Sequence, residues 1–116
     1  MTFRLTIQTP EVCAYDGEAE SLVAPSADGF FGVLANHAPM VGVITVGVLT
    51  VRTPAGPRLF AVGDGVAEVG GNAVRLLVEV ALPAANEGDA EVKREAYLKD
   101  KALPPYVARE SMPGGK

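Results

Sequence analysis

The stretch GFFGVLANHAP, residues 29–39, decides how the chain is interpreted, because it carries the only histidine of the protein in a segment bounded by glycine and proline. Apolar runs flank the stretch on both sides. Glycine and proline mark turns, so we expect a tight loop between two apolar strands. With one histidine, one cysteine and no tryptophan, the chain offers this loop few groups for chemistry. Recognition of a partner is therefore the favoured interpretation.

The composition predicts one folded domain that binds other proteins. The chain has 116 residues, of which 48% are apolar and 21% are charged, a balance typical of globular proteins rather than disordered ones. Its net charge of -4 argues against nucleic acid or an anionic lipid surface as the main ligand, since both attract basic proteins.

Cysteine usage and the amino terminus predict a cytosolic location. Cys13 has no second cysteine with which to form a disulfide, and the first residues, MTFRL, lack the basic and apolar regions of a signal peptide. The apolar run at residues 41–51 is interrupted by Thr45, Gly47 and Thr50 and is too short to cross a bilayer. Any association with a membrane is expected to go through another protein.

Residues 3–80 hold β-branched residues in short runs separated by turn signals, the pattern of an antiparallel sandwich or barrel of roughly nine strands. Short glycine- or proline-containing gaps at residues 53–57, 63–65 and 70–72 predict hairpins, so consecutive strands should run antiparallel. A further turn is predicted at residues 15–17, between strands at residues 4–8 and 18–23.

Two strand segments differ in their pattern. Residues 74–80 alternate between apolar and mostly polar side chains, which predicts one core face and one wet face. Residues 41–51 are apolar on both faces. Either one of these two faces contacts another subunit, or the strand is buried between two sheets of the same domain.

After residue 83 the composition changes to Ala, Glu and Lys, which predicts a helix over residues 90–103. Asp89 is the expected cap, Asp89/Lys93 and Glu95/Lys99 are favourable pairs, and two prolines at residues 104–105 end the helix. Residues 106–116 have no periodicity and are expected to form a flexible tail. The expected domains are thus a sandwich at residues 1–83 and a short helical region at residues 84–116.

The predicted helix has a thin apolar stripe formed by three residues and interrupted by a lysine: Val92, Ala96, Leu103 and Lys99. We therefore expect it to pack weakly or to bind a partner.

The residues that could carry catalysis are few. His37 is the sole candidate base and is flanked by Asn36 and Ala38 rather than by an acid. An enzyme that uses His37 with Asp64 or Glu68 is the disfavoured alternative. One histidine does not make a zinc or copper site, and the glycine pairs are not followed by the lysine of a phosphate loop. We expect no catalytic activity, no metal and no cofactor.

Three segments taken in order resemble a known family: residues 29–39, GVLTV at residues 47–51 and GVAEV at residues 65–69. They are similar to the epsilon subunit of F-type ATP synthases, which is called delta in mitochondria, and the likeness covers residues 3 to 82. The resemblance implies an antiparallel β-sandwich of about ten strands. It also implies a non-catalytic subunit of the central stalk that couples ion-driven ring rotation to ATP synthesis or hydrolysis.

The resemblance further implies three partners: the gamma subunit, the proteolipid (c) ring and, through them, the catalytic head. The location would be the cytoplasmic face of the inner (plasma) membrane. The predicted ring-facing residues are Phe30, Phe31, His37, Ala38, Pro39 and Met40. The predicted gamma-facing residues lie on one or the other face of a strand and are Val46, Val48, Leu49 and Val51.

The chain departs from this family in two places. Many members have an acidic or polar residue where this chain has Phe30, so an apolar ring contact is expected here. The family ends in a helical hairpin that can restrain ATP hydrolysis, whereas this chain supplies one helix, and we expect its carboxyl-terminal region to impose no such restraint. Residues 89–94 match the family's nucleotide-sensing pattern poorly, so ATP binding is not expected. The alternative function is a stand-alone β-sandwich adaptor that binds another protein.

Overall fold

The computed structural model describes residues 1–101, with side chains through Lys99, and it confirms a mainly β fold followed by one helix. The predictions for Leu103, for the two prolines and for the tail at residues 106–116 lie outside the described residues. The elements are β1 (Phe3–Gln8), β2 (Cys13–Ala19), β3 (Ser21–Ser26), β4 (Gly29–Leu34), β5 (Met40–Ile44), β6 (Gly47–Thr53), β7 (Gly56–Val62), β8 (Gly65–Gly70), β9 (Ala73–Val78), β10 (Ala81–Ala84) and α1 (Glu87–Lys101).

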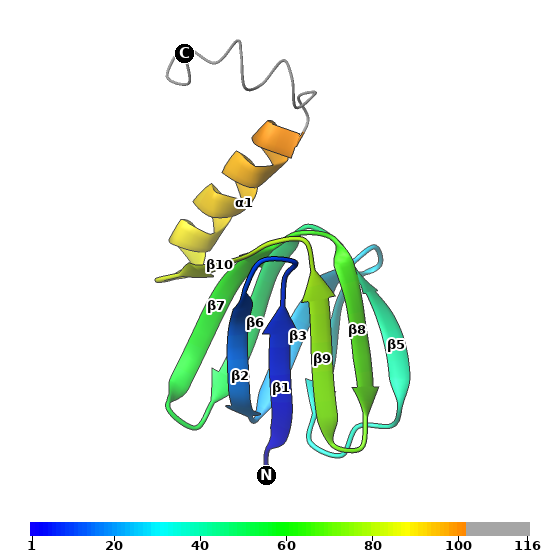
Figure 1. The fold of residues 1–116 in the computed structure, drawn as a ribbon. Coiled ribbons are helices and arrows are strands. Elements are labelled where there is room, and N and C mark those ends of the chain that lie inside the picture. The colour runs from blue at the N-terminus through cyan, green and yellow to red at the C-terminus, as the bar shows by residue number, and fades with distance from the viewer. Residues whose placement is uncertain (102–116) are drawn as a thin grey trace.

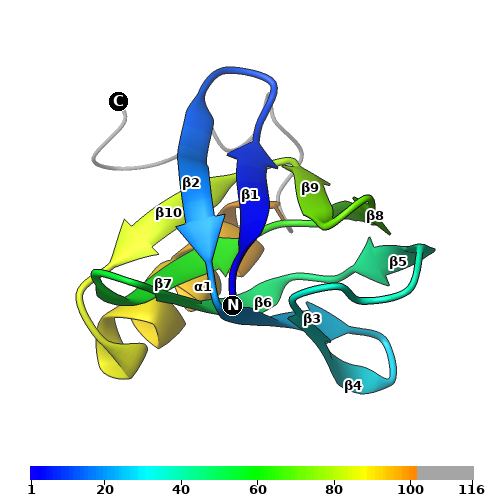
Figure 2. The same ribbon diagram turned by 90° about the horizontal axis from the view of Figure 1, so that it is seen from below.

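The strands form two five-stranded sheets packed face to face (Figures 1 and 2). The front sheet has the order β2-β1-β9-β8-β5, and the back sheet has the order β10-β7-β6-β3-β4. All pairs are antiparallel except β1 with β9, which is parallel. The hairpin predicted at residues 63–65 is wrong, because β7 belongs to the back sheet and β8 to the front sheet.

The core lies between the two sheets and follows the alternation of the strands. In β9, Val74, Leu76 and Val78 are buried while Arg75 is exposed, so the predicted alternation is confirmed, although the strand ends at Val78 and does not reach residue 80. From the back sheet, Leu49 and its cross-strand partner Phe60 are fully buried. Burying side chains of this size contributes about 1.5–3 kcal/mol each.

The apolar run at residues 41–51 is two strands in different sheets and not one strand as predicted. β5 is an edge of the front sheet, whereas β6 lies inside the back sheet. The chain crosses between them at residues 45–46, where the N–H of Thr45 donates to the carbonyl of Pro25 over 3.1 Å. The buried side chains of these two strands therefore reach the same core from two different sheets.

The turn predicted at residues 15–17 is wrong, because these residues lie in the middle of β2 and pair with β1. The chain instead turns at residues 9–12, where the buried Thr9 accepts the N–H groups of Glu11 and Val12 on its Oγ1. Tyr15 contacts the back sheet through the guanidinium of Arg58, which lies 5.5 Å from the ring centroids of both Tyr15 and Phe60. Pairing and packing thus outweigh the local turn propensity.

Helix α1 contacts β7, β10 and β6 and rises from the end of the sandwich at which β10 lies (Figure 1). Ala90 is fully buried there, Tyr97 donates its hydroxyl to Glu79 over 2.7 Å, and the Nζ of Lys93 donates to the carbonyl of Pro83 over 2.6 Å. Positions 90, 93 and 97 share one helical face. Val92 of the predicted stripe lies outside this face and is 67% exposed, so it does not pack against the sandwich.

The close approach of the paired strands β8 and β9 at Gly65 gives a test of the packing. A Cβ added at Gly65 would lie 2.0 Å from the carbonyl oxygen of Leu77 and 2.7 Å from the Cα of Val78. We expect Gly65→Ala to lower the free energy of unfolding by about 3 kcal/mol, because backbone atoms must move to admit the methyl group. Urea unfolding measures this change.

The matched control is Gly32→Ala in β4, where the nearest atom to the new Cβ is 3.7 Å away. Its free energy of unfolding should stay within about 0.5 kcal/mol of the original chain. Equal effects of the two substitutions on the free energy of unfolding would contradict the close approach of β9 to Gly65.

Candidate functional site

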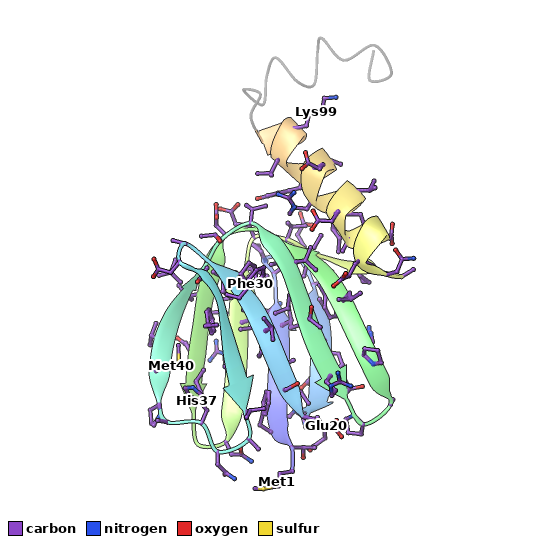
Figure 3. The ribbon with its side chains drawn as sticks, turned by 180° about the vertical axis from the view of Figure 1, so that it is seen from behind. Met1, Glu20, Phe30, His37, Met40 and Lys99 are labelled. Carbon is purple, nitrogen blue, oxygen red and sulfur yellow. The ribbon has the colours of Figure 1, made fainter. Side chains whose placement is uncertain are left out.

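The predicted docking loop at residues 29–39 is divided by the structure into a strand and a turn. β4 occupies its first part, and Phe30 pairs with Pro25 at one end while Leu34 pairs with Ser21 at the other. A strand rises about 3.3 Å per residue, so the ends of this six-residue strand lie about 17 Å apart. Phe30 lies at the end near α1, and His37 lies toward the opposite end (Figure 3). The prediction that Phe30 and Phe31 share one turn with His37 is wrong.

The turn that carries His37 is fastened to its neighbours by hydrogen bonds. The N–H of His37 donates to the carbonyl of Leu34 over 3.2 Å, and the N–H of Asn36 donates to the Oδ1 of Asn72 over 2.7 Å. The Nδ2 of Asn72 donates to the carbonyl of Thr2 over 3.0 Å. Asn36 and Asn72 have φ of 63° and 56°, a left-handed conformation that asparagine tolerates. This network fixes the shape of the turn.

The structure does not bring His37 together with either proposed acid. The ring Nδ1 of His37 lies 2.7 Å from the carbonyl oxygen of Ala38. Asp64 precedes β8 at the far end from the turn that holds Asn72, and Glu68 pairs with Arg75 at 3.9 Å. No nucleophile, base and acid are assembled here as catalysis would require.

The other residues of the predicted ring-facing set differ in exposure. Phe31 and Met40 are partly buried against the core, and both side chains lie 3.2 Å from where a Cβ of Gly42 would stand. They close the sandwich between β4 and β5. Ala38 and Pro39 are exposed in the turn, and Phe30 is 67% exposed. Phe30 is thus the large apolar side chain of the set that is available to a partner.

The predicted gamma-facing set is divided between core and surface. Leu49 and Val51 have no exposed area, so they are wrong as contact residues. Val48 points to the outer side of the back sheet and is half-buried, and Val46 lies in the crossing between β5 and β6 and is also half-buried. The alternation of β6 explains the division, because every second side chain belongs to the core.

The front sheet carries an apolar surface whose residues are outside the predicted ring-facing and gamma-facing sets. Val43, Val66 and Leu77 are cross-strand neighbours on β5, β8 and β9 and point away from the core. Val43 is 65% exposed, and Val41 beside it is 74% exposed. We call these four residues the front apolar face. The signal was present in the sequence, since Val41 and Val43 alternate with Ile44 and Gly42 across the strand.

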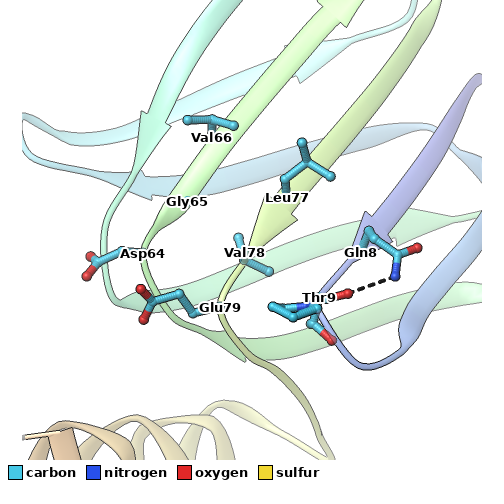
Figure 4. A pocket seen from close by; sticks show the side chains of 9 residues that line it. Gln8, Thr9, Asp64, Gly65, Val66, Leu77, Val78 and Glu79 are labelled. Atoms are coloured by element: carbon cyan, nitrogen blue, oxygen red, sulfur yellow. Dashed lines mark hydrogen bonds between the residues drawn. The ribbon is translucent and has the colours of Figure 1, made fainter.

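A hollow of about 550 Å³ continues the front apolar face toward the turn after β1 (Figure 4). Val66 and Leu77 form its apolar side, and Gln8 and Thr9 border it on β1 and the following turn. A second hollow of about 350 Å³ lies at the opposite end of the face, where Val41 borders it, so the face is hollowed at both ends.

A second surface lies on the back sheet, where α1 leaves β3 and β4 uncovered. A groove of about 450 Å³ runs there between the helix and the two strands. We call it the hairpin groove, and it is lined by Val23, Phe30, Val48, Thr50, Glu87, Gly88 and Glu91.

Within residues 1–101 no group of three or more His, Cys, Asp or Glu side chains is arranged to hold a metal ion. In the same part of the chain, no helix is both long enough and apolar enough to span a bilayer.

Comparison with known proteins now assigns the fold to a family. Residues 2–84 match the family described as "ATP synthase, Delta/Epsilon chain, beta-sandwich domain". The chain belongs to this ATP synthase family. It is 42% identical over 109 residues to the ATP synthase epsilon chain of Rhodopseudomonas palustris (strain TIE-1), covering 94% of this chain and 81% of that one. It is 31% identical over 102 residues to the epsilon chain of Leptospira interrogans, covering 88% and 80%.

Solved structures of similar shape come from mitochondrial ATP synthases. A chain in the F1 and c-ring structure from Euglena gracilis has a TM-score of 0.67 at 21% identity, covering 92% of this chain and 71% of that one. A chain in the central stalk and c-ring structure from Tetrahymena thermophila has a TM-score of 0.58 at 15% identity, covering 87% and 96%. At these identities the likeness shows the fold alone.

Membership of the family confirms two predictions. The chain is an epsilon-type subunit of an F-type ATP synthase, and such a subunit is structural and regulatory rather than catalytic. It is accordingly part of a complex that works at a membrane.

The first turn of α1, which lines the hairpin groove, is held by two side-chain caps. Asn86 accepts the N–H of Asp89 on its Oδ1, and Asp89 accepts the N–H of Ala85 on its Oδ2 over 2.9 Å. Asn86, rather than the predicted Asp89, is thus the residue before the helix that caps it. The predicted pair of Asp89 with Lys93 is confirmed at 3.2 Å, whereas Glu95 pairs with Arg94.

The hydrogen bond from Ala85, followed by the one from Lys93, lowers the pKa of Asp89 below its usual 3.8. The unfolded chain then binds a proton more readily, so the stabilisation is complete above about pH 4 and is lost as the pH falls through the folded pKa. We expect Asp89→Asn to be less stable than the original chain at pH 6, and the difference to shrink toward pH 3. Urea unfolding at several pH values measures it.

The control is Glu95→Gln, which removes another carboxylate of the same helix and should leave the free energy of unfolding at pH 6 within about 0.5 kcal/mol of the original chain. If the free energies of unfolding of Asp89→Asn and the original chain differ by the same amount from pH 6 to pH 3, the role of Asp89 is contradicted.

Proposed function

We propose that this chain couples ion-driven rotation of the proteolipid ring to ATP synthesis or hydrolysis, by binding the gamma subunit and the ring on two separate surfaces. Membership of the epsilon family supports the rotary role. The observation that carries the two-surface arrangement is that large apolar side chains are exposed on the outer sides of both sheets, Val41 and Val43 on one and Val23 and Phe30 on the other. The catalytic head is reached through gamma.

The gamma subunit is assigned to the front apolar face. β5 is an edge strand whose exposed side is apolar, and proteins usually cover or charge such edges to prevent aggregation. A partner that covers Val41 and Val43 would remove this hazard and bury the hollow beside Leu77 as well. This assignment replaces the set at residues 46–51.

The proteolipid ring is assigned to the end of the sandwich at the β3–β4 hairpin. Phe30 supplies an exposed aromatic side chain there, and aromatic residues are enriched in the cores of protein interfaces. The turn with His37, Ala38 and Pro39 lies toward the other end of β4 and is not part of this contact. The hydrogen bond from Asn36 to Asn72 ties this turn to the turn between β8 and β9.

The mechanical part of the proposal rests on stiffness. Torque passes between ring and gamma without loss only if the body between them does not deform. Two hydrogen-bonded sheets with a close-packed core meet this requirement, because each strand is held by ladder bonds and packed side chains. We place the chain at the cytoplasmic face of the inner (plasma) membrane, attached through its partners.

A charged substitution on the front apolar face tests the gamma assignment. We expect Val43→Asp to reduce the gamma recovered with the tagged chain from detergent-solubilised membranes by about tenfold, because a carboxylate would be buried without a partner. Quantitative immunoblotting of the bound fraction measures this.

Val92→Asp is the matched control, since Val92 is 67% exposed on α1 and Val43 is 65% exposed on β5. It should leave gamma recovery unchanged. Equal recovery with both variants would contradict the assigned face. If the unsubstituted chain recovers neither gamma nor the ring, the coupling role is wrong and the stand-alone adaptor is favoured.

A further inference from the structure

The hairpin groove is lined by exposed apolar side chains that the core of the fold does not need. Val23 is 41% exposed and Phe30 is 67% exposed, on strands whose inner sides already supply Leu22, Ala24 and Val33 to the core. Val48 and Thr50 on β6 complete the apolar base of the groove. These outward side chains add nothing to the core, so their exposed area is available to a partner.

The opposite side of the groove is acidic and comes from α1. Glu87 and Glu91 line it, and no basic side chain lines this part of the groove. Among the described residues Glu87 has no ion-pair partner, and Glu91 shares the guanidinium of Arg94 with Glu95, at 2.9 Å and 2.8 Å. The carboxylates of Glu91 and Glu95 thus share one positive charge, and the charge of Glu87 is not compensated by an ion pair among the described residues.

The position of the two acids sets a requirement on the occupant. An acid in the first turn, such as Glu87, also complements the helix dipole, but Glu91 stands one turn further along, where the dipole effect has faded. Beyond Glu91 the groove continues into a space of about 240 Å³ bordered by Phe30, Pro25 and Arg94. A segment that lies in the groove therefore meets carboxylates near Thr50 and a guanidinium near Pro25.

We propose that the hairpin groove binds a segment of the proteolipid ring that presents an apolar side chain to Val23 and Phe30 and a lysine or arginine to Glu87 and Glu91. This inference rests on the proposed function, which assigns Phe30 to the ring. Its new content is that α1 supplies half of the contact, so the sandwich alone is an incomplete binding surface. The charge complementarity selects the ring segment by its basic residue, and Phe30 and Val23 anchor it.

The test uses the ATP synthase assembled in its native membrane, with the photo-cross-linking residue p-benzoylphenylalanine placed singly at Phe30, Thr50 and Glu91. We expect all three positions to cross-link to the same ring segment, identified by mass spectrometry of the adducts. The control position is Arg52, which is exposed on the outer side of β6 two residues beyond Thr50 and does not line the groove. Arg52 should give at least about tenfold less adduct.

The charge requirement is tested with the double variant Glu87→Gln/Glu91→Gln. We expect ring recovery at low salt to fall about two- to fivefold, the range of exposed ion pairs, and the remaining binding to depend less on salt. Glu68→Gln on the front sheet removes one carboxylate far from the groove and should change neither quantity.

The outcomes separate the inference from the proposed function. If Phe30 cross-links to the ring but Glu91 does not, or if the glutamine variant binds as tightly as the original, the part played by α1 is wrong and the coupling role stands. If the chain recovers gamma but Phe30 and Glu91 both cross-link to gamma, the ring is the wrong occupant. If the chain recovers neither partner, both the inference and the coupling role fail.

Discussion

The structure depends on one constraint, which is that both sheets must bury their inner sides against a single core. The chain satisfies it by crossing between the sheets repeatedly, most sharply at residues 45–46, where β5 leaves the front sheet and β6 enters the back sheet. Gly47 follows the crossing at once, because a Cβ there would lie 2.6 Å from Pro25. Once the inner sides are used for folding, the outer sides are free to carry apolar residues for binding.

This separation explains why the two proposed binding surfaces lie on opposite sides of the sandwich. Leu49 and Val51 serve the core, while Val48 on the same strand borders the hairpin groove. On β5, Ile44 is buried while Val43 belongs to the front apolar face. Two partners that bind such outer sides would be held at a fixed spacing by the packed core, which is what transmission of torque requires.

The sequence predicted the fold where alternation and turn signals agreed. Residues 74–78 and the hairpin at residues 53–57 were predicted correctly, because the side-chain period of a strand is local information. Prediction from the sequence failed where pairing between distant segments determines the secondary structure. Residues 15–17 carry a turn signal yet form a strand, because β1 pairs with them, and residues 41–51 are continuous in hydrophobicity yet belong to two sheets. For the predicted ring-facing set, the sequence placed Phe30 beside His37, because it gives no measure of the strand that separates them.

The central claim is that a partner covers the outer side of the front sheet in the assembled complex, and amide hydrogen exchange tests it most directly. Exchange rates are compared between the isolated chain and the same chain in the ATP synthase. The account predicts that the amides of the edge strand β5, Met40–Ile44, exchange at least about tenfold more slowly in the complex. Unchanged exchange along β5, with slowing confined to other strands, would contradict it.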